Sequence, residues 1–149
     1  MSWARPPANG RDGAIEVEEL YGTWKLVSYT ARSESGEEAR TFGQAPSGIL
    51  NYGRDGRMFA MVVKDERLKV DASREPTDTE AAGLFHTMAA YGGTFTVAGD
   101  RVTHHVDISW NGSWTGTDQV RTFRIEGRKL FISSVQSDFV ASLVWEKMQ

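Results

Sequence analysis

The side chains best suited to chemistry in this sequence begin with two adjacent histidines, His104 and His105. Neighbouring side chains of a strand point to opposite faces, so these imidazoles cannot bind one metal ion from the same face. The residues that alternate with His104 are Val102, Val106, Ile108 and Trp110. Because they are apolar, we expect His104 to face the interior, either as a hydrogen-bonded core residue or as a group that binds a ligand or transfers a proton. If the opposite face points inward, His105 and Asp107 form a polar pair there.

Arg121 is the second candidate, and it alternates with Gln119, Phe123 and Ile125. Because Phe123 and Ile125 are apolar, we expect this face to be buried. An unpaired charge is costly in a low-dielectric interior, so the guanidinium needs a carboxylate, a backbone carbonyl or a ligand oxygen as its partner. Two roles stay open for Arg121, contact with a ligand and a structural role near the rim of a cavity. Gln119 adds a donor and an acceptor on the same wall.

Aromatic and hydroxyl side chains complete the candidate pocket. Tyr52 has an aromatic face and a hydroxyl tip, which suits either a ligand pocket or a structural position. Trp110 and Trp114 flank a turn at 111–113 and are costly to expose, so they line either a cavity mouth or a contact between copies of the chain. The predicted ligand-binding residues are Ser28, Tyr52, Met58, His104, Trp110, Gln119, Arg121 and Phe123.

Most of the elements that would position these residues have the composition of β-strands. Runs rich in β-branched and aromatic residues cover 22–31, 48–52, 57–63, 94–97, 101–110, 117–125, 129–133 and 141–147. In the first run, Trp24, Leu26, Ser28 and Thr30 share one face, whereas Lys25, Val27 and Tyr29 lie on the other. The sequence Asp55-Gly56 between two of the runs predicts a hairpin.

One stretch has helical periodicity instead. Ala81, Leu84, Phe85 and Met88 follow the spacing of an amphipathic helix. The pattern predicts a helix within 77–91 that begins at Thr77 or Thr79 and ends at Gly92-Gly93. This helix either covers the open end of the sheet or packs on its outer wall. A shorter helix is expected near 16–20.

Eight strands joined mostly by short turns predict an all-β antiparallel meander with one short helical insert. A sheet of this size closes into a barrel and so removes its exposed edges. We expect a barrel of eight strands, and at most ten. An eight-stranded barrel has room inside for side chains or one small ligand. Residues 1–14 are expected to form a flexible leader and residues 15–149 the barrel domain.

Composition argues against several classes of function. The 149 residues have a net charge of −3 and include no cysteine, which argues against a basic nucleic-acid surface, attraction to anionic membranes, disulfides and thiolate chemistry. No apolar run approaches the roughly 20 residues of a membrane helix, and no apolar segment follows the N-terminus, so a cytoplasmic protein is expected. Neither a metal nor a cofactor is expected, because there are only three histidines and no glycine-rich phosphate loop.

An ordered series of motifs carries a family resemblance. It opens with Tyr21-Gly22-Thr23-Trp24 and continues through 48–52, 90–95, 102–106, 116–121 and 145–147. The series resembles the calycins, the lipocalin superfamily, and is most similar to the bacterial lipocalin-like domain proteins, over about residues 20–147. The resemblance implies a β-barrel with a hydrophobic pocket for a small molecule, and no single reaction. In similar barrels a tryptophan fills the closed end under an arginine; here Trp24 would lie under Lys147, a weaker contact.

We therefore expect a protein, monomeric or homodimeric, that binds a small and largely apolar molecule inside a barrel. The alternative is a cofactor-independent enzyme, such as a cyclase, isomerase or hydrolase in natural-product metabolism. In such an enzyme Arg121 and Gln119 would polarise a carbonyl, while His104 or Tyr52 would move a proton. A third class is an interaction module whose exposed tryptophans dock a partner protein.

Overall fold

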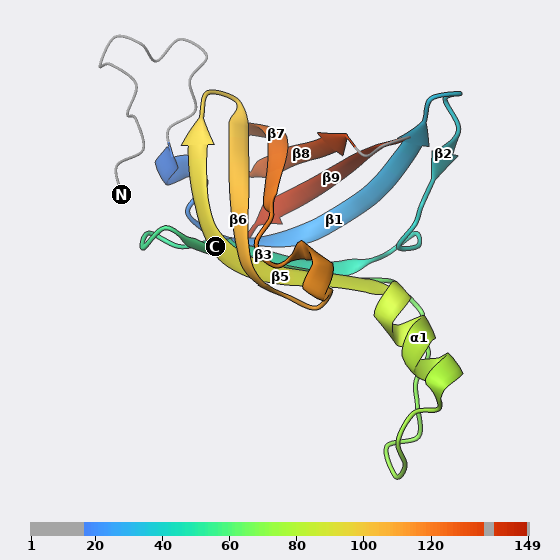
Figure 1. Cartoon of the computed structure of the whole chain (residues 1–149). Coiled ribbons are helices and arrows are strands. Elements are labelled where there is room, and N and C mark those ends of the chain that lie inside the picture. The colour runs from blue at the N-terminus through green and yellow to red at the C-terminus, as the bar shows by residue number, and fades with distance from the viewer. Residues whose placement is uncertain (1–16, 136–138, 149) are drawn as a thin grey trace, which may run out of the picture.

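One antiparallel sheet, closed on itself, makes up most of the molecule (Figure 1). The computed structural model describes residues 17–135 and 139–148. The strands are β1 Gly22–Ser33, β2 Glu38–Ala39, β3 Ser47–Tyr52, β4 Arg57–Val63, β5 Met88–Ala98, β6 Arg101–Ser109, β7 Asp118–Glu126, β8 Lys129–Val135 and β9 Phe139–Lys147. The helices are η1 Val17–Glu19, α1 Asp78–His86 and η2 Gly112–Trp114.

The order of the strands confirms the predicted eight-stranded barrel. It runs β2-β1-β3-β4-β5-β6-β7-β8-β9, and β1 also pairs with β9, which closes the barrel. The short strand β2 adds to the end of β1. The expected leader at 1–14 lies outside the described residues. Among the described residues, no helix is long and apolar enough to cross a membrane.

The β3–β4 hairpin forms where the Asp-Gly sequence predicted it. The Gly53 amide donates to the Arg57 carbonyl at 2.7 Å, and the Asp55 side chain accepts from the Arg57 amide at 3.1 Å. Gly56 has a φ of 86°, a conformation that glycine adopts without the steric cost of a side chain. The turn therefore fixes the register in which Tyr52 lies opposite Met58.

A β-bulge in β1 overturns the strict alternation expected for that strand. Leu26 pairs with Trp145 but Ser28 pairs with Val144, so Val27 is an extra residue. Trp24 and Leu26 point into the barrel, as predicted, but beyond the bulge Tyr29 faces the interior instead of Ser28. The prediction that Ser28 shares the inner face with Trp24 was therefore wrong.

A second bulge changes the end of β6. Gly92 pairs with Ile108 and Gly93 with Val106, so Asp107 is the extra residue. Ile108 is consequently 66% exposed, and the prediction that it faces inward was wrong. A Cβ at Gly93 would lie 1.9 Å from the carbonyl oxygen of His105, so this close approach requires glycine.

Helix α1 begins as predicted but ends early. Thr77 and Glu80 form a capping box, in which each side chain accepts a hydrogen bond from the other residue's amide. The helix ends at His86, and the residues from Met88 onward belong to β5. None of its residues, all of them described, is buried. The helix projects from one end of the barrel (Figure 1), so it does not pack on the outer wall.

The two ends of the barrel differ. At the end where β1 begins, Trp24 and Leu20 are almost completely buried, and the Trp24 indole donates to the Leu20 carbonyl at 2.9 Å. The Lys147 ammonium lies 4.4 Å from the Trp24 ring centroid, in the place where the resemblance implied an arginine. This end forms a packed floor. The opposite end, where α1 and η2 connect the strands, leads into the interior.

Candidate functional site

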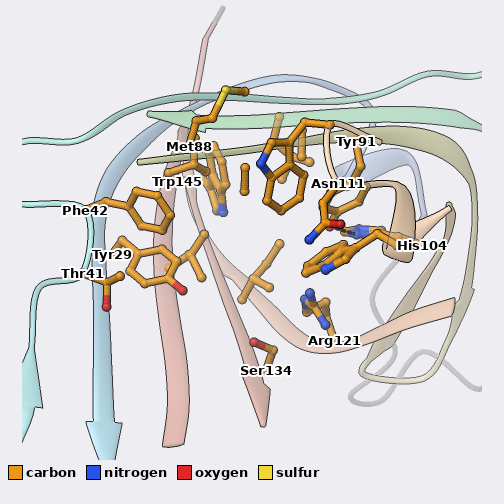
Figure 2. Close-up of a pocket in the computed structure, with 18 of the residues that line it drawn as sticks. Tyr29, Thr41, Phe42, Met88, Tyr91, His104, Asn111, Arg121, Ser134 and Trp145 are labelled. Atoms are coloured by element: carbon orange, nitrogen blue, oxygen red, sulfur yellow. Dashed lines mark hydrogen bonds between the residues drawn. The ribbon is translucent and has the colours of Figure 1, made fainter. Parts of the chain in front are cut away.

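A cavity of about 420 Å³ occupies the half of the barrel next to α1 and η2. This volume lies in the usual range for small-molecule sites. Its walls are mainly apolar and aromatic, from Phe42, Leu50, Val62, Met88, Leu143 and Trp145. Polar side chains reach it from Tyr29, Thr41, Tyr91, His104, Asn111, Arg121 and Ser134, several of them labelled in Figure 2. No aspartate or glutamate is among the described lining residues.

A hydrogen-bonded chain of three buried side chains runs from the core to the polar wall of the cavity. His104 on β6 is 2% exposed. Its Nε2 lies 2.6 Å from the Tyr52 hydroxyl of β3, and its Nδ1 lies 2.6 Å from the Tyr91 hydroxyl of β5. Both ring nitrogens of His104 therefore have hydrogen-bond partners. Figure 2 shows His104 beside Tyr91 on the cavity wall. The expectation that His104 faces the interior is correct, and it is hydrogen-bonded there.

Burial determines the charge states in this chain. Burial, helped by the nearby positive charge of Arg121, lowers the pKa of His104 to about 3, so the imidazole is neutral at neutral pH. Burial also raises the pKa of Tyr52 well above its usual value, and the neighbouring Tyr91 adds to that rise. The pKa of Tyr91 is raised by burial too, although Arg121 opposes the rise by its charge and by a hydrogen bond. All three groups are therefore neutral.

Arg121 is the charged group of the cavity wall (Figure 2). Its guanidinium donates to the Val120 carbonyl at 3.2 Å and lies 3.5 Å from the amide oxygen of Gln119. No ion pair joins it to a carboxylate within the described residues. Of the partners expected for Arg121, the structure therefore supplies a backbone carbonyl and a side-chain amide, but no opposite charge.

Aromatic rings surround the mouth of the cavity. The rings of Trp110 and Trp114 lie 5.5 Å apart, and those of Phe85 and Trp110 lie 5.8 Å apart. The Trp110 indole also donates to the Phe85 carbonyl at 3.2 Å, which ties the segment between β6 and η2 to the last turn of α1. Both tryptophans line the cavity, which is the first of the two positions expected for them, a cavity mouth or a contact between copies of the chain. The end of α1 thus contributes to the mouth through Phe85 and His86.

The predicted site residues fall into three groups. His104, Trp110 and Arg121 line the cavity. Tyr52, Met58 and Phe123 are buried in the core but are not among the lining residues. Gln119 pairs with His104 on the neighbouring strand and contacts a lining residue, Arg121, without being one itself. Ser28 faces away from the cavity because of the bulge in β1.

The second histidine faces away from the cavity. Nδ1 of His105 lies 2.9 Å from a carboxylate oxygen of Asp118, and its Nε2 lies 3.0 Å from the Thr96 hydroxyl. Asp107 pairs with Arg57 on the outer surface. The alternative of a polar pair of His105 and Asp107 inside the barrel was therefore wrong. In the described part of the chain, no group of three His, Asp or Glu side chains is placed to hold a metal ion.

Two tyrosines of the cavity were missed from the sequence. Tyr29 was assigned to the outer face because the bulge in β1 is not visible in the residue pattern. Tyr91 was assigned to the helix, yet Tyr91, Gly93 and Phe95 alternate as a strand does, and this signal was available. Trp145 was also missed as a lining residue; its indole nitrogen is the buried polar atom with no partner in the described residues.

Comparison with known proteins identifies the family. The family described as the lipocalin-like domain matches residues 21–148. No curated protein sequence matches the chain significantly.

Solved structures show limited similarity. A lipocalin-like protein from Bacteroides uniformis ATCC 8492 is 11% identical, with a TM-score of 0.49, and the match covers 87% of this chain and 99% of that one. An uncharacterized protein from Bacteroides eggerthii DSM 20697 is 11% identical, with a TM-score of 0.46 and coverage of 87% and 99%. The wild-type fluorescent protein UnaG is 16% identical, with a TM-score of 0.44 and coverage of 89% and 100%.

Proposed function

Because the chain belongs to the lipocalin-like domain family, we propose that it binds a small, largely apolar molecule inside its barrel. The observation that carries this proposal is the cavity of about 420 Å³, closed by a packed floor and bounded by mainly apolar walls. An apolar molecule of that size would remove its own surface and that of the wall from water. Such burial contributes roughly 25 cal/mol per Å².

The enzyme alternative has less support from the same geometry. Both ring nitrogens of His104 are engaged, and its pKa of about 3 makes the imidazole a poor proton acceptor at neutral pH. An enzyme requires that Arg121→Ala or His104→Ala lower turnover more than ligand affinity. A binding protein requires that affinity change and that no product form.

The binding proposal predicts that filling the cavity abolishes uptake of an apolar probe. Ala60 on β4 lines the cavity and is buried, so Ala60→Phe places a ring in the ligand space. Ala82→Phe adds the same ring to the exposed surface of α1 and serves as the matched control. Titration with the neutral fluorophore N-phenyl-1-naphthylamine is expected to show binding to the wild type and the control. Ala60→Phe should weaken it at least about tenfold.

Two further measurements accompany this titration. Thermal unfolding of each variant establishes that it is folded, and Ala89→Leu, also on the lining, replaces Ala60→Phe if the larger ring prevents folding. Native mass spectrometry of the purified wild type identifies any small molecule that is retained. A wild type that takes up no apolar probe, or a folded cavity-filled variant that binds as well as the wild type, contradicts the proposal.

A further inference from the structure

The chain Tyr52, His104 and Tyr91 has a direction, because a neutral imidazole has one N–H donor and one acceptor nitrogen. One tyrosine must therefore donate to His104 and the other must accept from it. The two 2.6 Å contacts do not differ in length, so the direction depends on what else each hydroxyl can reach. The inference that follows rests on the proposed function and specifies the ligand's chemistry.

Tyr52 can satisfy its own proton only by donating it to His104. Its side chain is 0% exposed, and His104 is its one hydrogen-bond partner within the described residues. If Tyr52 accepted from Nε2, its own O–H would be a buried donor without an acceptor, which is costly. The Tyr52 hydroxyl therefore donates to Nε2, and the proton of the imidazole is on Nδ1.

This direction leaves the Tyr91 proton free for the cavity. The Nδ1–H of His104 donates to the Tyr91 oxygen, and the positive charge of Arg121 is close enough to lower the pKa of that side chain. No described residue accepts the Tyr91 proton, and Tyr91 lies on the cavity lining. The donor on the phenol oxygen and the nearby positive charge polarise its O–H bond and strengthen it as a donor.

The second component is the positive charge of Arg121. The guanidinium lies on the lining, and no described carboxylate forms an ion pair with it. The described lining has no acidic residue, and it includes a further donor without a partner, the indole N–H of Trp145. The cavity therefore offers a cation and free donors, and its complement is an oxygen that carries negative charge.

We propose that Tyr91 and Arg121 form a two-donor site for a carboxylate group of the bound molecule. Tyr52 and His104 are positioning residues that hold the Tyr91 proton toward the cavity. The ligand is then an apolar body with one carboxylate, rather than a neutral hydrocarbon.

A matched pair of ligands tests the site. Calorimetric titration compares 2-naphthoate with methyl 2-naphthoate, which has the same ring and no charge. The wild type is expected to bind the carboxylate at least about tenfold more tightly than the ester. Arg121→Gln and Tyr91→Phe should each reduce the ratio of the two affinities, because each removes a donor that a carboxylate uses more strongly than an ester does. Arg124→Gln, an exposed arginine of the same strand, is the control and should keep the preference.

Nitrogen-15 NMR of the imidazole tests the positioning residues independently of any ligand. The expected spectrum of His104 is that of the neutral tautomer with the proton on Nδ1. An Nε2–H tautomer overturns the assigned direction.

The failure of this inference and that of the proposed function are distinguishable. Equal affinity for the acid and its ester, or an unchanged preference in Arg121→Gln, overturns the carboxylate site and leaves apolar binding intact. If 2-naphthoate, its methyl ester and the neutral fluorophore all fail to bind the wild type, both proposals fail.

Discussion

His104 is a titratable residue that is buried away from water, and this makes stability depend on pH. Its pKa falls from 6.5 to about 3 on folding because burial disfavours the imidazolium. Between these values the unfolded chain binds more protons than the folded one. The contribution of His104 to stability is thus complete above pH 6.5 and is lost as the pH falls toward 3.

We therefore expect the wild type to lose stability more steeply than His104→Gln as the pH is lowered from about 7 to about 5, by at most roughly 1.4 kcal/mol per pH unit. Urea unfolding at each pH measures the free energy of unfolding. Arg74 lowers the pKa of Glu80 to about 2, so this carboxyl group titrates below the pH range of about 5 to 7 that is compared. His86→Gln, a change at an exposed position, is the control. Equal slopes in the wild type and His104→Gln would show that the imidazole is not buried in a neutral form.

The β-bulge at which β6 pairs with β5 depends on a single glycine. A side chain at Gly93 would collide with the His105 carbonyl, so Gly93→Ala must displace one strand from the other. We expect it to lower the free energy of unfolding by about 2 kcal/mol or more. At Gly112 an added Cβ meets nothing within 4 Å, so Gly112→Ala should change stability by less than about 0.5 kcal/mol. Denaturant unfolding of both variants makes the comparison, and similar stabilities would argue against the close approach.

At the scale of the element, alternation predicted the faces of straight strands and failed at bulges. Along β7 it placed Gln119, Arg121 and Phe123 on one inner face, as the structure has them. It failed at Ser28 and Ile108, because an extra residue shifts every later side chain to the other face. A bulge is set by pairing with a distant strand, so the local sequence contains little sign of it.

The end of α1 shows the same limit. The apolar stripe of Leu84, Phe85 and Met88 continues past the end of the helix at His86. The apolar residues 88–91 fit a helix as well as a strand, so the pattern does not show where the helix ends. Pairing of β5 with β4 and β6 decides that they form a strand. The hydrogen-bonded chain of Tyr52, His104 and Tyr91 joins three strands and could not be predicted from any one of them.

At the scale of the whole molecule, the closed barrel and the projecting helix differ in stability. No residue of α1 is fully buried, whereas β4 and β5 contain core residues and pair on both edges. We expect the amides of α1 to exchange with deuterium at least about a hundredfold faster than those of β4 and β5, because α1 opens without unfolding the barrel. Exchange measured by NMR at neutral pH tests this expectation. Equal protection would mean that α1 unfolds only together with the sheet.

The packed floor beneath Trp24 has a kinetic consequence. With one end packed, the route between cavity and solvent within the described residues passes the mouth at the opposite end, which includes Phe85 and Trp110. A substitution at the mouth that leaves the contacts with a bound molecule unchanged alters the barriers to entry and to escape by the same amount. Such a substitution would alter the rates of association and dissociation by the same factor, whereas one that also removes a contact with the bound molecule would change the equilibrium constant.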